Sequence, residues 1–241
     1  MIAIFAAMEV ETRACLPALT TPEHRIGRFP AVFADGIAIC QTGLGRVARE
    51  AAEAFLSEHE PQAVLSVGTA GGLAPDVMLG EIVFGDRVWH SREPGSVAGD
   101  PDLVKVAVAI AAMEGLTARR GGSVTVDTVA WGPEEKAALR ATGAPDIVEM
   151  ESFWIGRAAA ARGLPYLAIR TISDDASNRL VEIPGLFDDQ GRVDSAALLE
   201  FVRQHPEVIP ELAAQHERGG LALANLSRFL QAFLPGLQQS L

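Results

Sequence analysis

The stretch Asp146-Ile147-Val148-Glu149-Met150-Glu151-Ser152 places two glutamates around a methionine, directly after an apolar pair. The apolar run that follows predicts a helix, and acidic residues are common at helix starts because the helix dipole favours them. About twenty residues on, the segment Arg170-Thr171-Ile172-Ser173-Asp174 closes a second apolar run with another acid. Ligands of open α/β sheets bind outside the carboxyl ends of the strands. These acids therefore indicate a site for a hydroxylated, protonatable ligand.

Length and composition bound the class of protein. The 241 residues, 49% of them hydrophobic, are enough for one large α/β domain with a substantial core, and we expect a single domain over 1–241. A net charge of −11 argues against nucleic acid or an anionic membrane as the main partner. Cys15 and Cys40 have no disulfide or zinc spacing, which favours the cytoplasm and predicts neither metal nor cofactor. No apolar stretch reaches the roughly 18 residues of a membrane span.

Strand and helix signals alternate from residue 1 to about 174. Strands are expected at 2–7, within 29–41, and at 63–67, 80–86, 118–126 and 164–172. Helices are expected from residue 8 until Pro17, from the Gly43–Gly45 turn to 58, and at 101–113, 133–142 and 153–160. The segments 89–100 and 178–192 are expected to be loops, and the tail from about 195 to carry helices at 195–204 and 207–233, with Gly219-Gly220 a candidate break. This alternation predicts a mostly parallel sheet with helices on both faces.

The segment Gly43-Leu44-Gly45-Arg46-Val47-Ala48 fits the dinucleotide-binding fingerprint and follows a predicted strand. That fingerprint needs an acidic residue at the end of the next strand to hold the ribose hydroxyls. Here the next strand ends Ser66-Val67-Gly68-Thr69, without an acid. The glycines are therefore interpreted as a tight strand-to-helix turn, with a nicotinamide or flavin enzyme as the weaker alternative.

A second glycine-rich segment, Gly68-Thr69-Ala70-Gly71-Gly72, lacks the Gly-Lys-Ser/Thr of a P-loop. It is either a plain turn or a place where backbone amides approach a ligand closely, with the Thr69 hydroxyl holding a water or a phosphate oxygen. Taken singly, Glu11 would be a solvated helix charge, Met8 a core residue and Asp174 a turn or helix cap.

Together, however, these motifs occur in an order that resembles the nucleoside phosphorylase superfamily, and within it most closely the methylthioadenosine/S-adenosylhomocysteine nucleosidases. The resemblance covers residues 1 to about 176. The matching segments are 7–11, 43–48, 66–75, 80–83, 148–151 and 170–174. The resemblance implies a three-layer α/β/α sandwich around a mixed, partly closed sheet, and commonly a homodimer.

The resemblance also implies a role for each matching residue. Asp174 would donate a proton to N7 of the purine, supported by Ser173, and Glu151 would hold the ribose hydroxyls. Glu11, with Thr69 and Arg170, would position the attacking water. The other substrate contacts that it implies are Met8 and Met150 at the sugar, Ala70 and Gly71 beside Thr69, and Glu149, Val129 and Ala130 near the base or behind it.

The chemistry of such a cleavage supports these roles independently. Breaking the C1′–N9 bond builds positive charge on the sugar and negative charge on the purine. An acid at the base relieves the second charge and a carboxylate near the sugar stabilises the first. Asp174 must be protonated when it acts, and burial beside other carboxylates would raise its pKa in that direction. Glu11 must be ionised to accept a proton from water.

Water is expected as the nucleophile in preference to phosphate. The resemblance implies that phosphorylases carry arginines near the end of the first strand and just before the Gly-Thr/Ser motif, where this chain has Met8-Glu9 and Val67. The charge of Glu11 would repel phosphate. Arg13, Arg46 and Arg170 keep phosphorolysis open as an alternative.

Three departures bear on the substrate. Trp131 is the nearest aromatic candidate to stack on the base, and the loop 89–100 is shorter than in the nucleosidases. The tail, with Asp188–Asp194 and Gln204-His205-Pro206, is similar to the hopanoid-associated phosphorylase-like branch, whose implied substrate is an adenosyl lipid precursor. The apolar C-terminal helix either opens the 5′ side to a bulky apolar group or packs on the sheet or a second subunit. A catalytically silent nucleoside-binding protein is disfavoured because the three carboxylates that the cleavage requires, those of Glu11, Glu151 and Asp174, are all present.

Overall fold

The computed structural model describes residues 1–15, 24–188 and 193–240. Its strands are β1 (Ile2–Ala6), β2 (His24–Ile26), β3 (Phe29–Ala34), β4 (Ile37–Gln41), β5 (Ala63–Gly72), β6 (Ile82–His90), β7 (Ser96–Ala98), β8 (Ala118–Thr125), β9 (Ile147–Glu149) and β10 (Tyr166–Asp174). Its helices are α1 (Glu9–Cys15), α2 (Val47–Glu58), α3 (Pro101–Met113), α4 (Pro133–Ala141), α5 (Ser152–Ala160), α6 (Ser195–Gln204), the 3₁₀ turn η1 (Pro206–Val208) and α7 (Ile209–Ser240).

The described strands form one mixed sheet that closes on itself over half its width. β10 pairs with both β6 and β5, so that β5, β10, β6, β8 and β9 make a ring, while β1, β4, β3 and β2 extend from β5 as an open sheet. β5 runs parallel to β1 and β10, whereas β6 is antiparallel to β10 and β9 is antiparallel to β5. The mixed, partly closed sheet is confirmed. The alternation of strands and helices alone predicted a mostly parallel sheet, and that prediction was incomplete. Alternation does not reveal antiparallel pairings as short as the one between β5 and β9.

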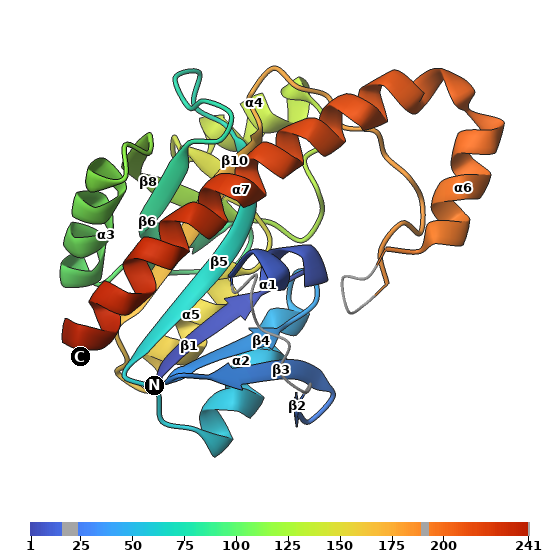
Figure 1. Ribbon diagram of the computed structural model, residues 1–241. Helices are drawn as coiled ribbons and strands as arrows, with labels where there is room; N and C mark the ends of the chain where they lie inside the picture. Colours follow the sequence, from blue (N-terminus) through green and yellow to red (C-terminus); the bar gives the residue numbers. More distant parts are fainter. Residues whose placement is uncertain (16–23, 189–192, 241) are drawn as a thin grey trace.

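Helices cover both faces of this sheet, as Figure 1 shows. Alternate residues of β1 face opposite layers: Ile2 and Ile4 join the core under α3 and α7, whereas Ala3 and Phe5 join the core under α2 and α5. This is the period-two pattern of a strand that is buried on both faces. The three-layer sandwich follows from it.

Local sequence signals explain the helix starts that were predicted correctly. Asp100 caps α3 by accepting hydrogen bonds from the backbone N–H groups of Asp102 and Leu103, with Pro101 at the first helical position. Asp194 caps α6 in the same way. Both helices begin where the sequence predicts.

Three expectations about the elements were wrong. β5 continues through Gly72, because Gly71 and Gly72 pair with β9, so the second glycine segment is strand and not turn. The expected loop 89–100 contains the end of β6 and all of β7. α7 passes through Gly219-Gly220 without a break. The expected helix stop at Pro17 lies outside the described residues.

α7 crosses one face of the sheet and is held there by its apolar stripe (Figure 1). Leu226, Phe229, Leu230 and Phe233 are all buried in the core, which confirms that this helix packs on the sheet. None of the helices in the described ranges combines the length and apolar composition that crossing a membrane requires.

The register of the central strands brings the predicted motifs to one edge. Ala6 of β1 lies beside Val67 of β5, and Thr171 of β10 lies beside Thr69. A register shift between Ile172 and Asp174 then places Asp174 beside Gly71. The ends of β1, β5, β9 and β10 thereby converge.

Candidate active site

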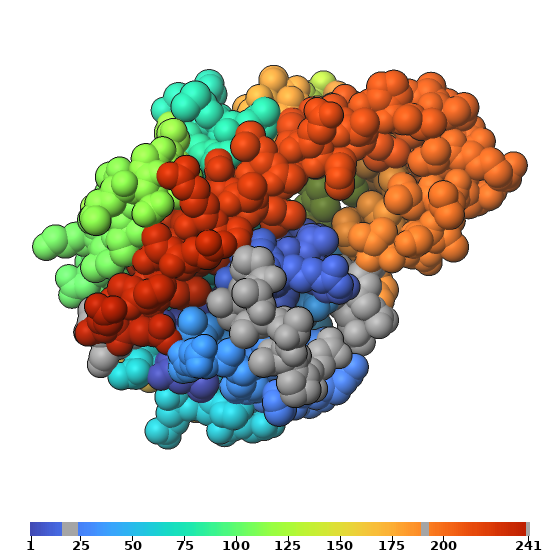
Figure 2. Space-filling view, in the orientation of Figure 1, coloured from blue at the N-terminus to red at the C-terminus, as the bar shows by residue number. Residues whose placement is uncertain are grey.

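A cavity of about 330 Å³ lies where these strands converge. Figure 2 shows a hollow between α7, the segment that carries α6, and α1. The lining comprises Ala7, Met8, Glu11, Leu44, Thr69, Ala70, Gly71, Val126, Val129, Ala130, Trp131, Val148, Glu149, Met150, Glu151, Ser173, Asp174, Leu180, Val181, Leu186, Phe187 and Gln215.

Glu11 is held as a hydrogen-bond acceptor at the end of β1. It lies in the first turn of α1 and is only 2% exposed. Its Oε1 accepts from the backbone N–H (2.8 Å) and Oγ1 (3.1 Å) of Thr69, and its Oε2 accepts from the N–H groups of Ala7 (3.2 Å) and Met8 (3.1 Å). These four donors hold the carboxylate in one orientation at the end of β1. Glu11 is thereby fixed at the wall of the cavity.

Glu151 lies at the start of α5, where its Oε1 accepts a 2.8 Å hydrogen bond from the N–H of Gly45. Burial raises the pKa of Glu151 to about 8, and the negative charges of Glu149 and Glu11 add to this effect. The Arg170 guanidinium and the Gly45 N–H oppose the rise without cancelling it. Glu151 thus has a buried carboxyl group that shares its charge partner with Glu149, because Arg170 Nη2 lies 3.6 Å from Glu151 Oε2 and 2.9 Å from Glu149 Oε2.

Glu149 and Arg170 form a buried ion pair behind the cavity. Arg170 Nη2 donates to Glu149 Oε2 at 2.9 Å and to the hydroxyls of Ser66 and Ser152 at 3.0 Å. The same Glu149 oxygen accepts from the N–H groups of Glu151 and Ser152, and Thr125 donates to its other oxygen. Glu149 therefore fixes the start of α5, and with it the position of Glu151.

Asp174 lies on the opposite wall, at the end of β10. Ser173 Oγ donates to its Oδ1 at 2.8 Å, and Lys136 Nζ donates to its Oδ2 at 2.5 Å. The expected neighbours of Asp174 were carboxylates, but the structure places a buried ammonium group against it. The expected account of its acidity rested on carboxylate neighbours and is wrong, because the charged group in contact with Asp174 is a cation.

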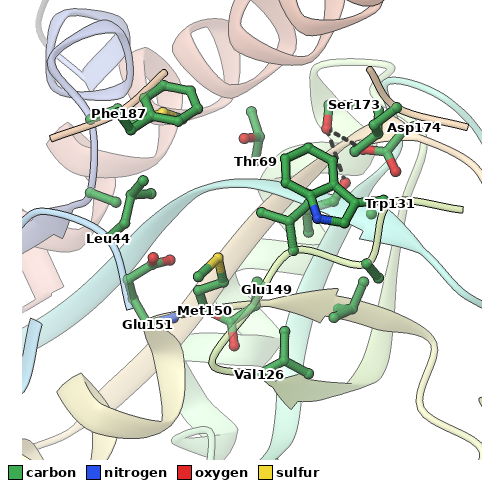
Figure 3. Close-up of a pocket in the computed structure, with 18 of the residues that line it drawn as sticks. Leu44, Thr69, Val126, Trp131, Glu149, Met150, Glu151, Ser173, Asp174 and Phe187 are labelled. Atoms are coloured by element: carbon green, nitrogen blue, oxygen red, sulfur yellow. Dashed lines mark hydrogen bonds between the residues drawn. The ribbon is translucent and has the colours of Figure 1, made fainter. Parts of the chain in front are cut away.

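Apolar side chains complete the cavity. Trp131 lies on the Asp174 side, whereas Leu44 and Phe187 lie together on the far side, with Glu151 and Met150 below (Figure 3). The segment that carries Leu180 is held by hydrogen bonds from the Leu180 N–H to the Trp131 carbonyl and from the Val181 N–H to Gln215. The cavity therefore has a polar floor and two apolar ends.

The structure brings together twelve of the thirteen predicted site residues. The residues that line the cavity are Met8, Glu11, Thr69, Ala70, Gly71, Val129, Ala130, Glu149, Met150, Glu151, Ser173 and Asp174. Arg170 differs, because it is fully buried behind the wall and its hydrogen bonds go to Glu149, Ser66 and Ser152. It supports the site from behind and does not face the cavity.

Sequence reasoning missed Lys136, Leu44 and the segment with Leu186 and Phe187. Lys136 lies three residues before Leu139 on α4, so helical spacing indicates that it faces inward. Leu44 could have been found as the residue between the two glycines of the turn. Nothing in the composition of the loop 178–188 distinguishes its lining residues.

No arginine or lysine of the described chain lines the cavity. Arg13 pairs with Glu9, and Arg46 lies over the Trp154 ring, 3.7 Å from Glu93. Arg170 is committed to Glu149. The three cations that kept phosphate open as a co-substrate are thus engaged elsewhere, whereas four carboxylates border the cavity.

Glu11, Glu151 and Asp174 thus border one cavity, and Asp174 lies across it from Glu151 (Figure 3). A family model described as the phosphorylase superfamily matches residues 2–202. The chain belongs to this superfamily.

Individual relatives agree with that assignment. A 5′-methylthioadenosine/S-adenosylhomocysteine nucleosidase of Actinobacillus succinogenes is 30% identical over 191 residues, which cover 70% of this chain and 82% of the relative. Among solved structures, the nucleosidase of that name from Campylobacter jejuni has a TM-score of 0.76 at 19% identity, with 100% and 99% of the two chains covered. The futalosine hydrolase of Helicobacter pylori has a TM-score of 0.75 at 16% identity, with 98% and 97% covered. At these identities the solved structures support the fold.

Proposed function

We propose that this protein hydrolyses the N-glycosidic bond of a 5′-substituted adenosine and releases adenine. The observation that carries the proposal is that Glu11, Glu151 and Asp174 all line one cavity. Glu11 takes a proton from the attacking water, Glu151 binds the ribose hydroxyls, and Asp174 delivers a proton to the departing purine. The relative from Actinobacillus, named for methylthioadenosine and S-adenosylhomocysteine, supports this substrate class.

Water is the proposed nucleophile because the described residues that line the cavity include no lysine or arginine to offset the charge of a phosphate. A phosphate beside Glu11 would face a carboxylate that four protein donors already hold in place. Two like charges about 4 Å apart repel by about 1 kcal/mol in water and more in a partly buried site. A water molecule has no such cost and can donate to Glu11.

The 5′ substituent is apolar in this proposal. Glu151 lies on the side of Leu44 and Phe187, across the cavity from Asp174 (Figure 3). A nucleoside with its base at Asp174 and its hydroxyls at Glu151 directs its 5′ carbon toward those two side chains. Leu186 extends the same wall. These residues favour a methylthio group, and they also favour the alternative of a longer adenosyl lipid, which the tail resembles.

Adenine release tests these assignments. Purified protein is assayed with methylthioadenosine, S-adenosylhomocysteine, adenosine and a 5′-alkylthioadenosine with a long chain, each with and without phosphate. We expect phosphate-independent release that is fastest with an apolar 5′ group. Release only with phosphate would establish the phosphorylase, and binding of adenine without turnover of any substrate would establish the silent binding protein.

The assembly and the location are part of the same proposal. The family resemblance favours a homodimer, and the cysteine content favours the cytoplasm. Light scattering coupled to size-exclusion chromatography measures the assembly directly, and a mass of about twice 25.5 kDa is expected.

A further inference from the structure

Lys136 is a buried lysine that the proposed reaction leaves unused. It lies on α4, is 1% exposed, and does not line the cavity. Its ammonium group donates to Asp174 Oδ2 at 2.5 Å, to the Asp175 carbonyl at 2.5 Å and to the Asn178 carbonyl at 3.4 Å. Burying an ammonium group is costly unless it is paired, so all three acceptors are needed to hold it there.

The same carboxylate oxygen that binds Lys136 also borders the cavity. Asp174 Oδ2 lies beside Gly71, which lines the cavity and has no side chain: a Cβ on Gly71 would be only 3.0 Å from this oxygen. Ser173 holds the other oxygen, Oδ1. Oδ2 is thus in contact with the ammonium group on one side and lies at the cavity wall on the other.

This geometry creates a difficulty for Asp174 acting alone. In this hydrogen bond the Lys136 nitrogen is the donor and Asp174 Oδ2 is the acceptor, so Oδ2 has no proton of its own to give to a purine. Among the described residues, the acidic hydrogen in direct contact with Asp174 Oδ2 is the one on Lys136 Nζ. The hydroxyl of Ser173 is far too weak an acid to replace it.

We propose that Lys136 positions Asp174 and supplies the proton that Asp174 passes to the purine. The Nζ–H bond breaks and an Oδ2–H bond forms. That hydroxyl then turns to the cavity, the Oδ2–H bond breaks, and a bond from the proton to N7 forms as the C1′–N9 electron pair moves onto the purine. Lys136 is left neutral. The proton that Glu11 takes from water returns through solvent, so that each turnover consumes one water and restores both groups.

Other charged groups surround the pair without replacing either member. Asp175 follows Asp174, and its side chain is engaged by Ser177 and by the Asn178 N–H. On α4 itself, Glu135 caps the helix start at the N–H groups of Trp131 and Gly132. Glu134 pairs with Arg179 of the following loop, at the surface. Of the charged groups around this point, Lys136 and Asp174 form the pair that is buried and in direct contact.

Two substitutions separate proton supply from simple anchoring. Lys136→Arg keeps the positive charge and the hydrogen-bond donors, but a guanidinium does not give up its proton in a protein. Lys136→Met removes the charge and keeps an unbranched side chain. Each variant is assayed with methylthioadenosine and with the same nucleoside methylated at N7, whose ring already carries positive charge and leaves without being protonated.

We expect Lys136→Arg to lose on the order of 10²-fold in kcat on methylthioadenosine and to stay within a few-fold of wild type on the N7-methylated nucleoside. For Lys136→Met we expect the basic limb of the pH profile of kcat/KM to move to lower pH, because the Asp174 carboxyl alone must then hold the proton. Activity on the methylated nucleoside shows that each variant is folded.

Two results would overturn the inference. One is a Lys136→Arg variant as active as wild type on methylthioadenosine, which would make Lys136 an electrostatic anchor only. The other is an equal loss on both nucleosides with an unchanged pH profile, which would make it a purely structural residue. The inference rests on the proposed function, and failure of the wild type to cleave either nucleoside would count against that function and not specifically against Lys136.

Discussion

The backbone N–H of Gly45 donates a 2.8 Å hydrogen bond to Oε1 of Glu151, across 106 residues of sequence. Gly45 has a φ of 71°, which favours glycine, and it belongs to the turn that enters α2. The turn therefore presents its N–H group to a carboxylate of the chain itself. The sequence that fits the dinucleotide fingerprint thus serves a different site here, because the N–H group of its turn is bound by the Glu151 carboxyl group.

Glu151→Gln should weaken substrate binding while stabilising the fold. Above pH 8, where Glu151 is ionised, a neutral amide accepts hydrogen bonds from ribose hydroxyls less strongly than the carboxylate, so KM should rise about tenfold. Because burial raises the pKa of Glu151 from 4.5 to about 8, the folded protein keeps a proton that the unfolded chain loses between these values. The free energy of unfolding of the wild type therefore falls as pH rises through this window.

Melting temperatures at pH 5 and pH 8 check the stability half of this prediction. At pH 8 the melting temperature of the variant should exceed that of the wild type by about 2–4 °C for each 1 kcal/mol that it adds to the free energy of unfolding. At pH 5 the difference should be much smaller. Equal differences at both values would show that the ionisation of Glu151 is not the cause.

Glu11→Gln should abolish most of the turnover with little change in nucleoside affinity. The amide keeps the side-chain shape but cannot accept a proton from water, so kcat should fall by about 10²–10⁴. Glu9→Gln is the matched control, because Glu9 is on the same helix but is exposed and pairs only with Arg13. Steady-state kinetics of both variants on methylthioadenosine make the comparison, and equal losses would argue against a specific role for Glu11.

Asp174→Asn should remove the acid at the purine and lower kcat by about 10²–10⁴. The loss should be recovered with the N7-methylated nucleoside, which needs no proton. The structure adds a second expectation: Lys136 would then lose its buried counter-charge, so the melting temperature should fall as well. A variant with full activity on methylthioadenosine would rule Asp174 out as the acid.

Gly68→Ala should distort the site, because position 68 lies against the side chains of Arg170 and Glu11. A Cβ at this position would lie 2.3 Å from Arg170 Nη1 and 2.6 Å from Glu11 Oε1. Since both groups are buried and hydrogen-bonded, overpacking should cost about 1–3 kcal/mol of stability and displace Glu11. Gly220→Ala is the opposite case, because it lies within α7 with nothing near its Cβ position and should stabilise by up to about 1 kcal/mol. Denaturant unfolding of both variants measures the contrast.

Phe187→Ala tests the 5′ side of the cavity. Phe187 is 38% exposed, so its truncation should cost about 1 kcal/mol of contact with an apolar 5′ group, or about fivefold in kcat/KM. Adenosine, which lacks that group, should be affected less. Leu199→Ala on α6 provides the control, because Leu199 is 70% exposed and does not line the cavity. An equal effect on both nucleosides would place the 5′ group elsewhere.

Much of the fold could be predicted because its signals are local. Asp100 before Pro101 determines the start of α3, and the unbroken apolar run from Ile2 predicts a buried strand. The pairing of Gly71 and Gly72 with β9 could not be predicted in this way, because glycines resemble a turn until the partner strand is known. For the same reason Gly219-Gly220 suggested a break that the packing of the rest of α7 overrides.

The candidate site divides along similar lines. Glu11, Glu151 and Asp174 were predicted because the family resemblance assigns roles to the motifs that contain them, and all three line the cavity. Lys136 was missed because its helix precedes those motifs and its meeting with Asp174 depends on how α4 packs against the end of β10. Arg170 was assigned to the cavity because the family resemblance implies that it positions the attacking water with Glu11 and Thr69, but in the structure it donates to Glu149.

The central claim is that water attacks the sugar within this cavity. Turnover of methylthioadenosine in oxygen-18-labelled water, followed by mass spectrometry of the sugar product, tests it most directly. We predict that one labelled oxygen appears at C1′ of the released sugar, that the amount is unchanged by added phosphate, and that Glu11→Gln abolishes it. A sugar 1-phosphate without the label would contradict hydrolysis and assign the chain to the phosphorolytic branch of its superfamily.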